Sequence, residues 1–303
     1  MELLPLDVKT AVNRVERMPF RWSLNPYRGC THSCIYCYAR VTHEYLGLNA
    51  GTDFNHRVFY KRNVVEALRA QLRSRSWRGE PVALGTATDV YQPAEGRLRL
   101  TRQILETMME YGNAVTITTK SPLVLRDLDL LKQLAEGPGV TVYLSVGTVD
   151  TDAWRFLEPG TPPPKYRLRA LEHLRREGIR AGVLMAPIVP RINDAPAQLE
   201  ATVRAAAAAG AAFLAPSVLR LPHGAREWFL ERVAAERPKL APFYREFYKG
   251  DTSPPAYVRA VETRVRRLRE KYGIPESSAE AGRPAAAAAQ GAGRAALQLS
   301  LPL

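Results

Sequence analysis

The sequence contains little cysteine, fewer acidic than basic residues, and no long apolar run. Only three of its 303 residues are cysteines, and all three stand between positions 30 and 37. No apolar leader that would indicate an oxidising compartment precedes them, so a disulfide framework is disfavoured. No run of eighteen apolar residues occurs, so we expect no membrane span and place the protein in the cytoplasm.

The shortage of acidic residues gives the chain a strongly basic balance. Its 43 Lys and Arg residues against 30 Asp and Glu give a formal charge of +13. Clustered cations neutralise phosphates, so nucleic acid is a possible partner. A genome biased towards Arg and Ala would produce the same excess on solvated helix faces, and both interpretations stay open.

Strand and helix patterns alternate along most of the chain, which favours one large α/β domain with a parallel sheet. Right-handed crossovers then leave a barrel or an open doubly wound sheet, which the pattern alone does not separate. Helices are expected between the strands. The six expected strands are Phe20–Arg28, Pro81–Thr86, Ala114–Thr119, Val140–Val146, Arg180–Val189 and Ala211–Leu221.

Composition divides the chain into four expected segments. Residues 1–19 form an N-terminal arm, and residues 20–222 form the core. Residues 223–275 carry further helical patterns, including a strongly basic one over 256–272. Residues 276–303 consist largely of Ala, Gly, Ser and Pro, so we expect a disordered tail.

The three cysteines lie in one loop at spacings of four and three residues, which is typical of metal ligands. Gly29 supplies the backbone freedom for the loop to curl around one centre. A disulfide, a zinc site completed by His32 or His43, and three unmetallated thiols are weaker alternatives to an iron–sulfur cluster. A 4Fe-4S cluster normally takes four thiolates, so three would leave one iron open to a small molecule.

The spacing C-x3-C-x-Tyr-C resembles the signature of the radical S-adenosylmethionine (SAM) superfamily. Five further stretches resemble its spore photoproduct lyase-like branch, often labelled DNA repair photolyase, between about Phe20 and Pro222. The resemblance implies a partial (β/α)6 barrel of the TIM type with a C-terminal helical extension. It also implies a 4Fe-4S cluster and SAM, which together generate a 5′-deoxyadenosyl radical that abstracts hydrogen from substrate. The five stretches are Asn25–Cys30, Ala87–Glu95, Thr119–Ser121, Glu158–Pro162 and Pro187–Asp194.

The resemblance also implies roles for single residues. It makes Cys30, Cys34 and Cys37 the cluster ligands. It places Thr88 and Asp89 near the SAM amino group, although both residues also suit a turn. The resemblance further implies that Lys120 and Ser145 (or Thr148) bind the SAM carboxylate. It also implies that the backbone of Tyr36 contacts the adenine.

Two tyrosines and one threonine bear on the reaction. In spore photoproduct lyase the tyrosines matching Tyr36 and Tyr38 belong to a radical-transfer path that also uses a cysteine as hydrogen-atom donor. Thr86 occupies that cysteine's position here, and no other thiol is left. We therefore do not expect repair of spore photoproduct.

The sequence does not identify the substrate. We expect SAM and an electron donor such as flavodoxin or ferredoxin as partners, with nucleic acid as a possible substrate. The alternative from another class is a non-catalytic zinc- or nucleic-acid-binding protein, which would need the cysteines and the positive charge but neither Lys120 nor Asp89.

Overall fold

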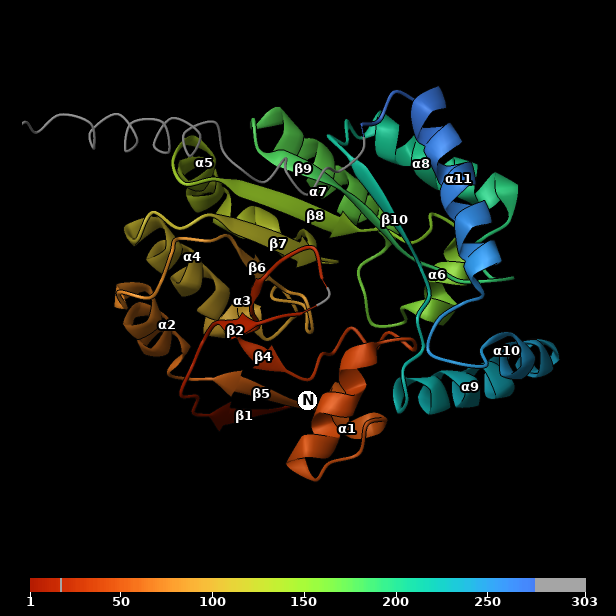
Figure 1. Cartoon of the computed structure of the whole chain (residues 1–303), viewed down its shortest axis with the longest axis horizontal. Helices are drawn as coiled ribbons and strands as arrows, with labels where there is room; N and C mark the ends of the chain where they lie inside the picture. The colour runs from red at the N-terminus through yellow and green to blue at the C-terminus, as the bar shows by residue number, and fades with distance from the viewer. Residues whose placement is uncertain (17, 276–303) are drawn as a thin grey trace, which may run out of the picture.

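The computed structural model describes residues 1–16 and 18–275, and its main element is a seven-stranded sheet (Figure 1). The predicted tail, 276–303, lies outside the described residues. The strand order is β10-β9-β8-β7-β6-β3-β2. The strands are β2 Asn13–Arg14, β3 Trp22–Leu24, β6 Val82–Leu84, β7 Val115–Thr119, β8 Val140–Ser145, β9 Arg180–Ile188 and β10 Leu214–Val218.

Six of these strands run parallel, from β3 through β6, β7, β8 and β9 to β10, and each lies within one of the six predicted stretches. The first predicted strand, Phe20–Arg28, is divided, because Tyr27–Arg28 pairs in a second sheet. Only β2 pairs antiparallel, at the edge beside β3. Within the described ranges no ladder joins β10 to the opposite edge, so the barrel is partial and open. The helices that follow the strands are α3 Glu95–Leu98, α4 Leu100–Glu110, η2 Pro122–Asp127, α5 Leu128–Glu136, α6 Thr151–Leu157, α7 Pro164–Arg176 and α8 Pro196–Ala208.

The central strands of the sheet are buried on both faces. Every side chain of β6 is buried, as is nearly all of β8, because helices pack on one side and the barrel interior lies on the other. The helices α5 and α7 contact β8, and α7 also contacts β9. Parallel strands all end at the same edge, so the loops that follow β6, β7 and β8 meet there.

A second, three-stranded sheet with the order β1-β5-β4 was not foreseen. The arm contributes β1, Glu2–Leu6, which pairs in parallel with β5, Arg57–Lys61. Antiparallel pairing joins β5 to β4, Tyr27–Arg28, directly before the cysteine loop. The short elements between them are η1 Tyr38–Leu46, α1 Thr52–His56 and, after β5, α2 Val64–Arg73.

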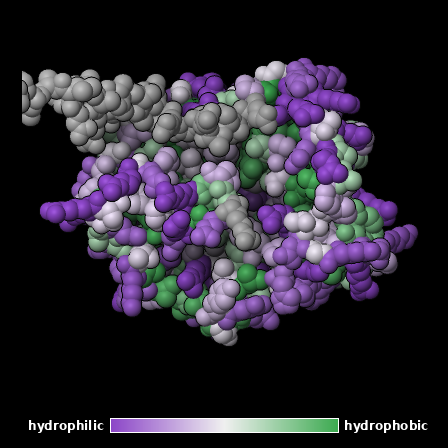
Figure 2. All heavy atoms as spheres, in the orientation of Figure 1, coloured by the Kyte–Doolittle hydropathy of each residue, from purple (hydrophilic) through white to green (hydrophobic). Residues whose placement is uncertain are grey.

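The C-terminal helices follow β10 as expected. The basic helix α11, Pro255–Lys271, packs against α8 and β10 on the outside of the barrel (Figure 1). Hydrophilic side chains dominate the upper end of α11 in Figure 2. No helix of the described residues has the length and apolar character needed to cross a membrane. The other elements here are α9 Ala225–Glu236, η3 Pro238–Leu240 and α10 Ala241–Phe247.

Candidate active site

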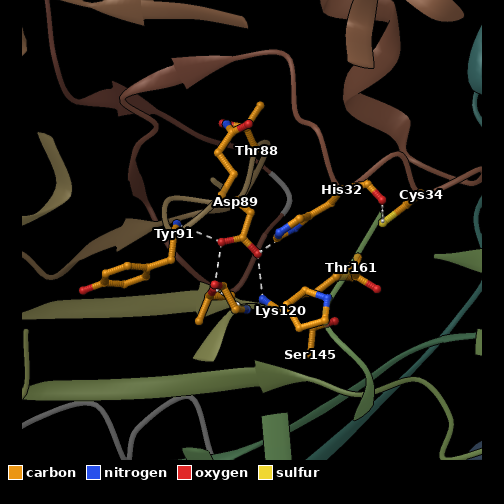
Figure 3. Close-up of polar contacts among 12 residues, drawn as sticks. His32, Cys34, Thr88, Asp89, Tyr91, Lys120, Ser145 and Thr161 are labelled. Atoms are coloured by element: carbon orange, nitrogen blue, oxygen red, sulfur yellow. Dashed lines mark hydrogen bonds and ion pairs between the residues drawn. The ribbon is translucent and has the colours of Figure 1, made fainter. Parts of the chain in front are cut away.

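Polar side chains meet at the carboxyl ends of β6, β7 and β8, with Asp89 at their centre (Figure 3). Its Oδ1 accepts hydrogen bonds from the Tyr91 amide at 2.9 Å and the Thr119 hydroxyl at 2.7 Å. Its Oδ2 accepts one from the Lys120 amide at 2.6 Å. Asp89 therefore ties the loop after β6 to the end of β7.

The same carboxylate faces His32 of the cysteine loop. The Nδ1 atom of His32 lies 3.3 Å from Oδ2 of Asp89, and both side chains are buried. Burial disfavours a charged imidazole, but the Cys30 thiol and the Asp89 carboxylate outweigh it and raise the pKa of His32 to about 10. Burial would also raise the pKa of Cys30, yet the charge of His32 holds it below its usual value. His32 thus connects a candidate cluster ligand to the strand ends.

The cysteine loop is tightly curled, as the glycine before it suggests. Gly29 has a φ of +83°, and a Cβ there would lie 2.7 Å from the carbonyl oxygen of Arg57. The Cys30 amide donates to the carbonyl of Phe54 at 3.0 Å. All three cysteines are free thiols, with Cys30 and Cys34 buried and Cys37 partly so.

Gln92 and Thr88, in the segment after β6, are hydrogen-bonded to this loop and to the strand before it. Gln92, which is fully buried, donates to the Gly29 carbonyl at 3.1 Å and accepts from the Thr31 amide at 3.2 Å. The Thr88 hydroxyl donates to the Tyr27 carbonyl at 3.0 Å. The side chains of Thr88 and Asp89 thus already have partners inside the protein, and their contact with SAM stays a prediction.

Arg40 also supports the loop, although nothing in the sequence pattern singles it out. Its side chain is fully buried and donates to the Cys34 carbonyl through Nε at 3.3 Å and through Nη2 at 3.1 Å. Its Nη1 donates to the carbonyls of Ala50 and Gly51 at 3.1 and 2.8 Å. One guanidinium therefore joins the loop to the segment before α1.

Lys120 lies beside the thiols, and its ammonium makes no hydrogen bond or ion pair with any residue between 1 and 275 that the structure describes. Its Nζ lies 5.9 Å from the centre of the Tyr36 ring. Burial would lower the pKa of Lys120, but the nearby Cys34 and Glu158 raise it overall. Lys120 is thus a charged group with free donors at the strand ends.

The other predicted residues are less centrally placed. The phenol of Tyr38 donates to the Thr86 carbonyl, and half of its side chain is exposed. The Ser145 hydroxyl donates to the Ala186 carbonyl at 3.2 Å, and Thr148 caps the turn before Asp150. The alternative zinc ligand His43 is bound to the Arg57 carbonyl at 3.0 Å.

Within the described residues no three His, Cys, Asp or Glu side chains are gathered closely enough for a single metal ion. Gln92 and Arg40 were not predicted as site residues, and Glu158 appeared only in a stretch that resembles the family. The phenol of Tyr36 donates to Glu158, which is 5% exposed. Only the fold brings these side chains to the cysteine loop, because each is distant from it or unremarkable in type.

Comparison with known proteins assigns this arrangement to a class. Residues 24–204, more than half of the chain, match the family model of the radical SAM superfamily. The chain belongs to this superfamily and is an enzyme whose cofactors are a 4Fe-4S cluster and SAM.

Individual relatives extend the match beyond the core. An uncharacterised protein of Mycobacterium tuberculosis is 41% identical over 268 residues, which cover 87% of this chain and 79% of that protein. The radical SAM Nα-GlyT isomerase of Pseudomonas phage M6 is 28% identical over 168 residues, 55% of this chain and 33% of that protein. Spore photoproduct lyase complexed with dinucleoside spore photoproduct has a TM-score of 0.68 at 18% identity, over 89% of this chain and 79% of that one, which indicates a shared fold.

The residues present fit both cofactors. Three free thiols lie in one loop for the cluster. The Lys120 ammonium, without a hydrogen-bond or ion-pair partner in the described part of the chain, lies 5.9 Å from the centre of the Tyr36 ring in that loop and is available for a carboxylate. The buried Nδ1 of His32 has no hydrogen-bond partner of good geometry beyond its ion pair with Asp89.

Proposed function

We propose that Cys30, Cys34 and Cys37 hold the 4Fe-4S cluster and that Lys120 binds the SAM carboxylate. When bound, the cluster and SAM supply a 5′-deoxyadenosyl radical that abstracts hydrogen from a substrate. The observation that carries the proposal is the Lys120 ammonium, which has no hydrogen-bond or ion-pair partner among the described residues and lies 5.9 Å from the centre of the ring of Tyr36, between two of the chain's three cysteines. Thr88, Asp89, Ser145 and the backbone of Tyr36 complete the proposed SAM site.

Anaerobic reconstitution tests the ligand set. The wild-type protein is expected to take up iron and sulfide near four each per chain and to form 5′-deoxyadenosine with dithionite and SAM. The triple variant Cys30→Ala, Cys34→Ala, Cys37→Ala is expected to bind neither. Stoichiometric zinc in aerobically purified protein, without any deoxyadenosine formation, would favour the binding-protein alternative.

Lys120→Met tests the SAM site separately. The variant should keep its iron and sulfide, because Lys120 touches no cysteine through a hydrogen bond, while its SAM affinity falls about tenfold with the loss of one charged hydrogen bond. Isothermal titration of the reconstituted protein measures this. Unchanged SAM affinity would remove Lys120 from the site.

Nucleic acid is the substrate class we propose, with flavodoxin or ferredoxin as the reductant. A surface hollow of about 680 Å³ between η2 and α7 supports the proposal of a nucleic-acid substrate. Tyr166, which is 42% exposed, lines it, and the cations of Lys165 and Arg169 lie 5.0 and 5.8 Å from the centre of that ring. An exposed ring with two cations close to it suits a stacked base with its phosphates. The hollow also includes Pro162, next to the loop that contacts Tyr36.

A pair of double variants separates this hollow from the other basic surface. Tyr166→Ala with Arg169→Ala should weaken binding of a single-stranded oligonucleotide about tenfold and flatten its salt dependence by about one contact. Arg264→Ala with Arg267→Ala, on the exposed face of α11, is the control, and it removes two positive charges where the first variant removes one. Fluorescence anisotropy across a salt series measures both, and a larger loss in the α11 variant would place the nucleic acid elsewhere.

A further inference from the structure

The loop between α6 and α7 packs directly on the cysteine loop. The Ile35 amide donates to the Leu157 carbonyl at 3.0 Å, and the Gly160 amide donates to the His32 carbonyl at 3.1 Å. The approach at Gly160 is so close that a Cβ there would lie 2.4 Å from the Thr31 carbonyl oxygen. The two loops therefore form one unit on both sides of Cys34.

Glu158 carries this contact to the side chain of Tyr36, which stands between Cys34 and Cys37. One carboxylate oxygen, Oε1, accepts from the Tyr36 phenol, and the other lies 2.6 Å from Nη2 of Arg167. Burial would raise the pKa of Glu158, but Arg167 and Lys120 hold it below its usual value, so the carboxylate stays charged.

Arg167 connects the same unit to the barrel. Its side chain is fully buried, and Nη1 donates to the Ser145 carbonyl, the end of β8, at 2.8 Å. Its Nε donates to the Pro162 carbonyl at 2.9 Å, and Nη2 to the Thr161 hydroxyl at 2.5 Å. A buried charge with this many directed bonds has one orientation, because moving it would leave several carbonyls without donors.

We propose that Glu158 and Arg167 are positioning residues of the cofactor site. They fix the Tyr36 ring, and through it the segment between two proposed cluster ligands, at a set distance from the end of β8 and from Lys120. Neither side chain needs to touch SAM or the cluster. The inference rests on the proposed ligand set and adds the residues that orient it. Residues that hydrogen-bond to metal ligands are known to orient those ligands and to affect metal affinity, and we expect the same of Glu158 and Arg167.

Glu158→Gln tests the proposal, because the amide keeps an oxygen for the phenol and loses the ion pair to Arg167. Tyr36→Phe, which removes only the phenol oxygen, is the milder second variant. Both should retain iron and sulfide near the wild-type content. Both should bind SAM about 10- to 100-fold more weakly and show an altered electron paramagnetic resonance signal of the reduced cluster on SAM addition. In cluster-free protein, the amides of Ile35 and Gly160 should exchange hydrogen faster than in the wild type.

Glu95→Gln is the matched control, since Glu95 is also fully buried, accepts from a phenol (Tyr27) and pairs with Arg126 at 2.7 Å. It should lose comparable thermal stability yet keep wild-type SAM affinity and signal. The inference would be overturned if Glu158→Gln had the SAM affinity and signal of the wild type, or if Glu158→Gln and Glu95→Gln lost them equally. Neither result would affect the proposed function. Wild-type protein that takes up no cluster would overturn the proposed function as well.

Discussion

At the scale of single residues, a buried cation holds the cysteine loop against neighbouring segments. Arg40 is fully buried and its guanidinium bonds four acceptors, the carbonyls of Cys34, Ala50 and Gly51 and the side chain of Asn55. It also lies 4.7 Å from the ring centre of Trp228. Its position three residues after Cys37 lets it turn back onto the loop.

We predict that Arg40→Met destabilises the protein by about 3 kcal/mol, because buried carbonyls lose a charged donor. The cluster of the reconstituted variant should also lose iron to a chelator faster. Urea unfolding and the rate of iron release measure the two effects. Arg176→Met, at a side chain that is 68% exposed, is the control and should change stability by less than about 0.5 kcal/mol. Equal stability of the two variants would contradict the role of Arg40.

Lys61 gives a prediction about pH. Its side chain is 7% exposed, and burial, with the charge of Arg28 adding to it, lowers its pKa to about 8. Below pH 8 both folded and unfolded chains carry the proton, so the cost of burying the charge is fully present. Between about pH 8 and 10.5 only the unfolded chain keeps it, and stability rises with pH.

Lys61→Met should therefore be more stable than wild type at pH 7 by up to about 3 kcal/mol, the equivalent of the pKa shift. This advantage should shrink between about pH 8 and 10.5. Chemical denaturation of both proteins across this range measures the difference. A constant difference would show that Lys61 does not titrate as described.

At the scale of elements, the loop between α6 and α7 positions the cysteine loop through close backbone packing at Gly160. Gly160→Ala would place a Cβ 2.4 Å from the Thr31 carbonyl oxygen and 2.9 Å from that of His32. Backbone atoms cannot yield cheaply, so we predict a loss of about 1–3 kcal/mol and reduced cluster uptake.

The control for this substitution is Gly250→Ala, because nothing lies within 4 Å of a Cβ at Gly250. It should leave stability and iron content unchanged. Thermal unfolding and iron analysis compare the two variants. If Gly160→Ala behaved like the control, the two loops would not be packed as the structure shows.

At the scale of the whole molecule, the distribution of thiols limits the reaction. Every cysteine lies in one loop, and Thr86 uses its hydroxyl to accept from the Asn25 amide group at 3.3 Å. After a lesion is cleaved, the product radical needs a hydrogen atom from a weak bond, and an alcohol O–H is a poor source.

We therefore predict that the reconstituted enzyme cleaves SAM but does not repair a dinucleotide spore photoproduct. Incubation with that dinucleotide and analysis of the products by chromatography is the measurement. Multiple turnovers to the thymine dinucleotide would contradict the prediction and would point to Tyr36 or Tyr38 as the donor.

Local patterns along the chain are enough to predict the cofactor class and the alternation of strands and helices. The spacing of Cys30, Cys34 and Cys37 and the alternation of buried strands with amphipathic helices are both short-range patterns. Both can therefore be recognised in the sequence alone. The six parallel strands accordingly appear where they were predicted. The strand β5 was missed because its pairing with β1 joins residues 55 positions apart.

Which polar side chains meet could not be predicted, because it depends on how distant segments pack in the fold. Contact of Asp89 and Thr88 with SAM stays a prediction, and the fold already gives Asp89 partners in the cysteine loop and at the end of β7 and gives Thr88 one in β4. Glu158 lies more than 100 positions from Tyr36 and reaches it, with Arg167 paired behind it, only because parallel strands end at one edge. A buried charge is fixed by the neighbours that satisfy it, and those neighbours are set by packing rather than by sequence spacing.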